Sequence, residues 1–180
     1  MSNSSIAVYP KTTAQDVVGR LTQINPDWRL SVNARKFDYD ADILIASHAH
    51  SVAVWASGNA RGQDHELQTE IGRHSSHPWL RILFQDHVAW EYLLYQNGLV
   101  IDRFMPLPSM WGLDKPELGQ PSLLASIWGV PEKTISKYLR EWNAKTRGRK
   151  AFWWRDQWKF GQFEQGFDFL RALTGIEFPS

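Results

Sequence analysis

The chain of 180 residues is predicted to fold as an α+β domain, in which an antiparallel sheet is packed by an N-terminal helix and several C-terminal helices. Three observations predict this class. Apolar residues near the start recur at helical spacing, the middle of the chain alternates as strands do around a strong hairpin signal, and helical spacing returns in the last third. Strands followed by a run of helices favour α+β over alternating βαβ units.

The first helix is expected over residues 13–24. Thr13 can cap its N-terminus, and Asp16 stands three residues later, where its carboxylate can bond back to the cap. Pro26 ends the helix, because the residue before a proline avoids the helical conformation. The apolar stripe expected to face the core is Val17, Val18, Leu21 and Ile24.

Strands are expected next. Residues 28–35 alternate between apolar and polar side chains, as a half-buried strand requires. Residues 43–46 and 51–55 are apolar runs rich in β-branched side chains, which favour two strands over a short helix running into one strand. Residues 58–78 contain several glycines and serines and a proline, and their pattern suits either a strand or a short helix.

A hairpin over residues 88–104 is the strongest local signal. Asn97-Gly98 suits a two-residue turn in which both residues take positive φ. Counting back from that turn predicts Gln96 opposite Leu99 and Asp102 opposite Leu93. Both faces of the hairpin are apolar, so it is expected at the centre of the sheet and covered on both sides. A buried carboxylate at Asp102 then needs a partner, for which an arginine is expected.

A connection rich in proline and glycine follows at residues 106–121. It is the one place where the single domain predicted for residues 1–180 could be subdivided. Helices are expected at residues 121–128, 131–142 and 162–173. Pro121 and Pro131 stand in first turns, where a missing N–H does no harm, and Gly175 can end the last helix.

Composition excludes several kinds of protein. The chain has no cysteine, so disulfides, thiolate nucleophiles and cysteine-bound zinc are ruled out. The formal net charge is +1, although residues 131–180 hold ten Lys/Arg and six Asp/Glu. The N-terminus lacks the features of a secretory signal, and no apolar run approaches the ~18 residues of a membrane span. A cytoplasmic protein without membrane contact or cofactor is expected.

The segment from Leu123 to Leu139 carries a specific pattern. Ala125 is small enough to let two helices cross closely, Gly129 stands four positions later, and Ile135 and Tyr138 would anchor a second helix. This pattern resembles the helix-turn-helix of bacterial DNA-binding regulators, in which the second helix enters the major groove. The resemblance implies that residues 121–142 read DNA, but a plainly packed pair of helices has the same pattern. The residues that the resemblance places in the groove are Glu132, Lys133, Thr134, Ser136 and Lys137.

Six histidines are the candidate metal ligands. His48 and His50 lie two apart, so on a strand both side chains point to one face, as in several metal sites. His74 and His77 form a second pair, and aspartates and glutamates elsewhere could complete a site. A metal-dependent hydrolase built on His48 and His50 is therefore one hypothesis, and histidines exposed in loops are the alternative.

Aromatic and basic residues are mixed between residues 145 and 159. Large rings beside cations can stack on nucleobases or sugars, or bind an acidic protein, and the same mixture also suits a strand with buried rings and a solvated basic edge. The residues expected to contact a partner are Trp153, Trp154, Trp158, Arg147, Arg149 and Lys150.

No catalytic motif of high specificity is present. No serine stands in a G-x-S-x-G elbow, and the glycines at 58 and 62 lack the lysine that ends a phosphate-binding loop. Enzymatic activity is therefore not favoured. The leading hypothesis is a non-catalytic domain that binds an unknown protein partner. Nucleic-acid binding through residues 121–142 is the alternative, and a metal-dependent hydrolase is the third hypothesis.

Overall fold

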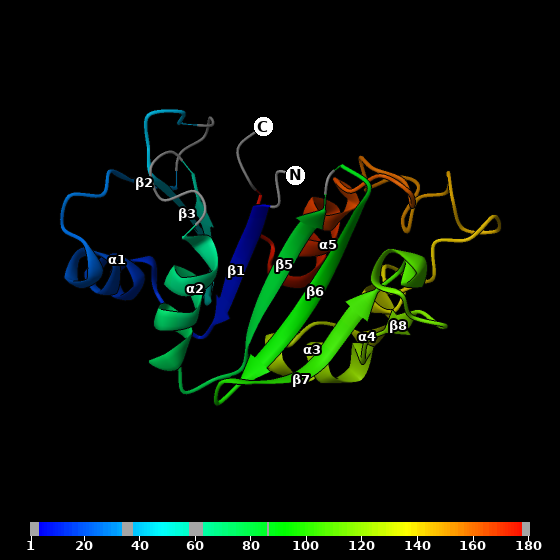
Figure 1. The fold of residues 1–180 in the computed structure, drawn as a ribbon, viewed down its shortest axis with the longest axis horizontal. Helices are drawn as coiled ribbons and strands as arrows, with labels where there is room; N and C mark the ends of the chain where they lie inside the picture. Colours follow the sequence, from blue (N-terminus) through cyan, green and yellow to red (C-terminus); the bar gives the residue numbers. More distant parts are fainter. Residues whose placement is uncertain (1–3, 34–37, 58–62, 86, 178–180) are drawn as a thin grey trace.

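A computed structural model describes residues 4–33, 38–57, 63–85 and 87–177, and Figure 1 shows its fold. Within these ranges the chain forms an eight-stranded sheet in the order β2-β3-β4-β1-β5-β6-β7-β8. Neighbouring strands are antiparallel except β2 and β3. The α+β class and a mostly antiparallel sheet are thereby confirmed. The strands are β1 (Ser4–Pro10), β2 (Leu30–Val32), β3 (Ile43–His48), β4 (Ser51–Ala56), β5 (Trp79–Gln85), β6 (Ala89–Gln96), β7 (Leu99–Met105) and β8 (Glu117–Leu118).

Helices cover different halves of the sheet on its two faces (Figure 1). Helices α1 (Ala14–Ile24) and α2 (Asp64–Arg73) lie beside the N-terminal strands, and α3 (Pro121–Trp128), α4 (Glu132–Ile135) and α5 (Gln165–Thr174) lie behind the C-terminal strands. Strand β1 borders both cores, because Ile6 and Val8 join the core under α5 while Ala7 and Tyr9 join the core under α1 and α2. Six consecutive residues of β1 are buried as a result, which hides the alternation that identifies a strand.

Several expected elements differ from those observed. Helix α1 occupies the predicted residues, with both hydrogen bonds of the capping box between Thr13 and Asp16. Strand β2 has only three residues instead of the eight expected over 28–35, of which 34 and 35 lie outside the described residues. The ambiguous stretch 58–78 contains α2 and ends just before β5; residues 58–62 lie outside the described residues. Strands β1 and β5 were not expected.

The hairpin β6–β7 has the predicted turn but a different register. Gln96 pairs with Leu99 and Tyr95 with Val100, as expected, and Asn97 and Gly98 both have positive φ. A bulge between Leu94 and Tyr95 then shifts every later pair by one residue. The hairpin also lies toward one end of the sheet instead of its centre, and Leu99 is 70% exposed at its tip.

The bulge changes the surroundings of Asp102. This carboxylate lies opposite Leu94 and not opposite Leu93, on the same face as Tyr92. It accepts hydrogen bonds from the Tyr92 hydroxyl at 2.7 Å and from the Gln120 backbone N–H at 2.9 Å. The expected arginine partner was therefore wrong for this side chain: a buried phenol and a backbone amide stabilise it instead.

The C-terminal third contains less helix than expected. Helix α3 has the predicted bounds, and α5 begins three residues later than expected. The helix expected over 131–142 was wrong beyond Ile135, because α4 is a single turn. The backbone N–H of Trp142 donates to the Pro106 carbonyl, 3.2 Å away, instead of continuing a helix. Residues 136–164 consist of turns and irregular segments. No helix in the described ranges is long and apolar enough to cross a membrane.

Candidate functional site

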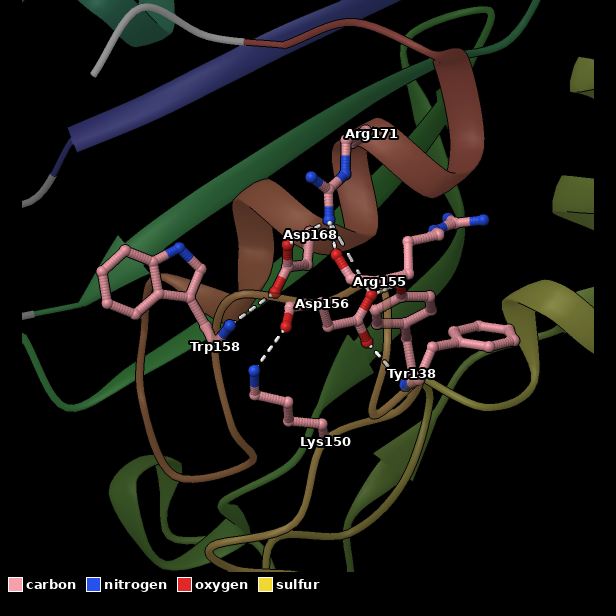
Figure 2. Close-up of polar contacts among 8 residues, drawn as sticks. Tyr138, Lys150, Arg155, Asp156, Trp158, Asp168 and Arg171 are labelled. Carbon is pink, nitrogen blue, oxygen red and sulfur yellow. Dashed lines mark hydrogen bonds and ion pairs between the residues drawn. The ribbon is translucent and has the colours of Figure 1, made fainter.

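The irregular segment between α4 and α5 is held in place by a buried polar network (Figure 2). Asp156 lies at its centre and is 3% exposed. Its Oδ1 accepts a hydrogen bond from the Tyr138 hydroxyl at 2.6 Å, and its Oδ2 accepts one from the Phe152 backbone N–H at 2.7 Å. One carboxylate thus joins two loop segments that no strand or helix connects.

Helix α5 supplies the other half of the network. Asp168 accepts from the Trp158 backbone N–H at 2.7 Å and forms an ion pair of the same length with Arg171, one turn further along the helix. The Arg171 guanidinium also donates to the Arg155 carbonyl at 2.8 Å and lies 4.0 Å from Asp156. Figure 2 shows both α5 side chains pointing from the helix toward the loop. The loop is therefore fastened to the core by charge-assisted hydrogen bonds.

Burial changes how two of these groups titrate. Burial, together with the hydrogen bond to Asp156, raises the pKa of the Tyr138 phenol far above its ordinary value, so the hydroxyl remains a donor. Burial also raises the pKa of Asp168, and the backbone hydrogen bond from Trp158 and the Arg171 charge only partly offset that effect. Both shifts follow from desolvation inside a structural network.

Two adjacent tryptophans stand on the outer side of this network. Trp153 is 80% exposed and Trp154 is 66% exposed. Their rings meet edge to face at 6.0 Å, and Trp154 also meets Phe152 edge to face at 5.6 Å. Phe152 is half-buried and packs against Tyr138, with the Lys137 ammonium 4.1 Å above its ring. The exposed rings therefore stand on an ordered base instead of a loose loop. Trp158, the third tryptophan among the predicted contact residues, is half-buried.

The same segment is strongly basic. Residues 133–159 contain nine Lys/Arg and only two acids, Glu141 and Asp156. Asp156 is buried in the network, and Glu141 accepts a hydrogen bond from the Asn143 side chain at 3.0 Å. Among the described residues, the ion pairs with a carboxylate involve none of these nine cations. We call this feature the basic surface; its cations are Lys133, Lys137, Arg140, Lys145, Arg147, Arg149, Lys150, Arg155 and Lys159.

The helix-turn-helix-like segment has the turn but not the second helix. Gly129 has a φ of 69°, and the N–H groups of Gly129 and Val130 both donate to the Ala125 carbonyl. Lys133 and Thr134 lie on α4, but Ser136 and Lys137 lie beyond its end. With a rise of about 1.5 Å per residue, this helix is only about 6 Å long. Lys133 and Lys137 therefore belong to the basic surface and not to a helix that reaches into a groove.

The two histidine pairs lie on different segments, at the end of β3 and at the end of α2. His48 ends β3, His50 lies in the turn before β4, and both are exposed. They border a shallow hollow of about 630 Å³ whose lining also includes Arg155, Arg171 and Glu177. The two arginines are cations and not ligands for a metal. His74 caps the end of α2, where its ring lies 3.4 Å from Glu70. No group of three or more potential metal ligands occurs among the described residues.

Sequence reasoning located the exposed tryptophans and the cations but missed the groups that order them. Tyr138 was interpreted as an anchor of a helix, and Asp156, Asp168 and Arg171 were not singled out. The spacing of Asp168 and Arg171 in a predicted helix was the one available signal, since residues three apart lie on one face.

Comparisons with known proteins give no family for this chain. No family model, no curated protein and no solved structure matches it.

Proposed function

We propose that this protein is a non-catalytic binding domain whose basic surface binds an acidic segment of another protein. The observation that carries the proposal is the pair of exposed rings, Trp153 and Trp154, on a loop that Asp156 and Arg171 fasten to the core. Exposed tryptophan at the centre of a patch is characteristic of binding hot spots.

The arrangement combines three properties that favour association. The two tryptophans offer large apolar area with little side-chain entropy to lose. The surrounding cations attract an acidic partner and raise the rate of encounter. The buried network already orders the loop, so less conformational entropy is lost on binding than with a flexible loop. An acidic partner with an apolar side chain between its carboxylates complements this surface.

Nucleic acid is the second candidate, because rings beside cations also suit single strands. The tryptophan planes make an angle of 85°, and those of Phe152 and Trp154 an angle of 76°. Rings in this arrangement do not form the row of parallel faces on which successive bases stack. Duplex recognition in the major groove is further disfavoured by the single turn of α4. Both observations favour the protein partner.

The test compares three fluorescently labelled probes: a peptide of Asp, Glu and Leu, a single-stranded oligonucleotide and a duplex of matched length. Anisotropy is measured across a salt series for the wild-type protein and for the double variant Trp153→Ala/Trp154→Ala. Leu99→Ala is the matched control, since it removes another exposed apolar side chain from the hairpin tip.

We expect the peptide to bind, and the double variant to weaken it about 30-fold, corresponding to the truncation of a hot spot worth about 2 kcal/mol. Leu99→Ala should bind like the wild type. Peptide binding that is equal in the double variant and the wild type contradicts the proposal. Binding of an oligonucleotide but not of the peptide establishes the second candidate instead.

A further inference from the structure

A small hollow within the basic surface has an unusual lining. Its volume is about 120 Å³, and five of its eight lining residues are cations. No carboxylate belongs to the lining, as far as the chain is described. We call it the cation pocket; its lining is Lys137, Arg140, Lys145, Thr146, Arg149, Lys150, Ala151 and Phe160.

The backbone around the cation pocket is ordered by hydrogen bonds. The Arg149 N–H donates to the Thr146 carbonyl at 3.1 Å, and the Arg149 carbonyl accepts from the Phe160 N–H at 2.8 Å. Phe160 is 4% exposed and joins the main core, so one wall of the pocket is rigid. The Thr146 hydroxyl donates to the Glu141 carbonyl, which closes the loop next to Lys145. The cations therefore project from a fixed frame.

The cations of the pocket are incompletely satisfied. Lys150 donates one hydrogen bond, from Nζ to the Asp156 carbonyl at 2.6 Å, and Lys137 rests on the Phe152 ring. Both ammonium groups keep further N–H donors. The side chains of Arg140, Lys145 and Arg149 make no hydrogen bond or ion pair within the described chain. Five like charges around one hollow repel one another, and an anion in the hollow would remove that repulsion.

We propose that the cation pocket binds a phosphoryl group carried by the acidic protein partner. This inference rests on the proposed function, because it names the chemical group that the partner presents. With a volume of about 120 Å³ the hollow is small, which suits a compact anion such as a phosphoryl group. Arginine and lysine donors are the groups that phosphate oxygens accept from most strongly.

The charge of the pocket favours a phosphomonoester over other anions. A phosphorylated side chain carries about −1.5 to −2 at neutral pH, whereas a carboxylate carries a single charge. A phosphodiester of nucleic acid also carries one charge per phosphate and continues as a chain on both sides. A terminal group with the larger negative charge is therefore attracted most strongly to a hollow lined by five cations.

Calorimetry with two otherwise identical acidic peptides tests the inference, one containing a central serine and the other a phosphoserine, with inorganic phosphate as a third probe. The pocket variant is Arg140→Gln/Lys145→Gln/Arg149→Gln. The matched control is Lys133→Gln/Arg147→Gln/Lys159→Gln, which removes the same charge from exposed positions outside the pocket. Circular dichroism and thermal unfolding verify that both variants fold.

We expect the phosphopeptide to bind at least about tenfold more tightly than the serine peptide, as several charge-assisted hydrogen bonds provide. The pocket variant should lose this difference, and the control should retain it while binding both peptides more weakly. Equal binding of the two peptides overturns the pocket and leaves the proposed function intact. If both variants reduce the affinity difference between the two peptides equally, the pocket is also refuted, because the loss of net charge then explains the effect. Binding of inorganic phosphate that only the pocket variant abolishes, with no peptide binding, supports the pocket and refutes the acidic-protein partner.

Discussion

Removing one hydroxyl should test whether the buried network holds the irregular loop between α4 and α5 in place. In Tyr138→Phe the hydrogen bond to Asp156 is lost, although the ring can still pack in its buried site. The bond is 2.6 Å long, and without it Asp156 Oδ1 has only the Arg171 guanidinium at 4.0 Å. A hydrogen bond to a buried charged group contributes about 1.5–3 kcal/mol, so we expect the free energy of unfolding to fall by about 2 kcal/mol.

Urea and thermal unfolding followed by circular dichroism measure this loss. For a domain of this size, about 2 kcal/mol corresponds to a decrease in Tm of roughly 4–8 °C. Tyr95→Phe is the matched control, because Tyr95 stacks on Trp79 at 4.5 Å and its hydroxyl makes no hydrogen bond in the described chain. The control should stay within about 0.5 kcal/mol of the wild type. If the stability of Tyr138→Phe also stays within about 0.5 kcal/mol of the wild type, the hydrogen bond to Asp156 does not stabilise the loop.

Two further predictions concern other buried polar groups. Gly119 has a φ of 67°, and a Cβ there would overlap the Tyr92 hydroxyl that donates to Asp102, so Gly119→Ala should destabilise the protein by about 3 kcal/mol or more in urea unfolding. Gly98→Ala has a similar φ of 79° but open space around the new Cβ, and it should lose only about 1–2 kcal/mol; equal losses would refute the role of the Tyr92 contact. The folded-state pKa of Asp168 is raised above 3.8, so the fold binds the proton more tightly than the unfolded chain. The contribution of Asp168 to stability is complete below pH 3.8 and is lost as the pH rises through the folded-state pKa. The unfolding free energy of the wild type, measured relative to that of Asp168→Asn across acidic pH, should therefore fall as the pH rises. A difference that stays constant or increases with pH would contradict the raised pKa of Asp168.

Local signals in the sequence were reliable where a few neighbouring residues decide the structure. The capping box of Thr13 and Asp16 placed the start of α1, and Asn97-Gly98 placed the hairpin turn. Both depend on contacts over three residues or fewer. The register beyond the turn could not be predicted in the same way, because the bulge next to Leu94 lets Asp102 meet Tyr92 and the Gln120 N–H, which comes from a distant segment.

The interpretation of residues 131–142 failed for a related reason. Ile135, Tyr138, Leu139 and Trp142 are all buried, as the helical spacing predicted, but the spacing of buried residues does not require a helix. Once Tyr138 bonds to Asp156 and the Trp142 N–H bonds to Pro106, the chain must leave the helical path. Strand β1 is the opposite case, since burial on both faces removed its alternation and hid it.

For the candidate site, the sequence by itself determined composition: residues 133–159 concentrate cations and tryptophans, with only two carboxylates against nine Lys/Arg. Only the tertiary structure decided that Trp153 and Trp154 are exposed while Phe152 is packed beneath them, and that five of the cations surround one hollow. The physical reason is that this segment has no regular backbone periodicity. The loop is oriented by the bond from Tyr138 to Asp156 and by the bonds that join Asp168 and Arg171 of α5 to Trp158 and Arg155, and these α5 contacts form only when α5 packs against the sheet.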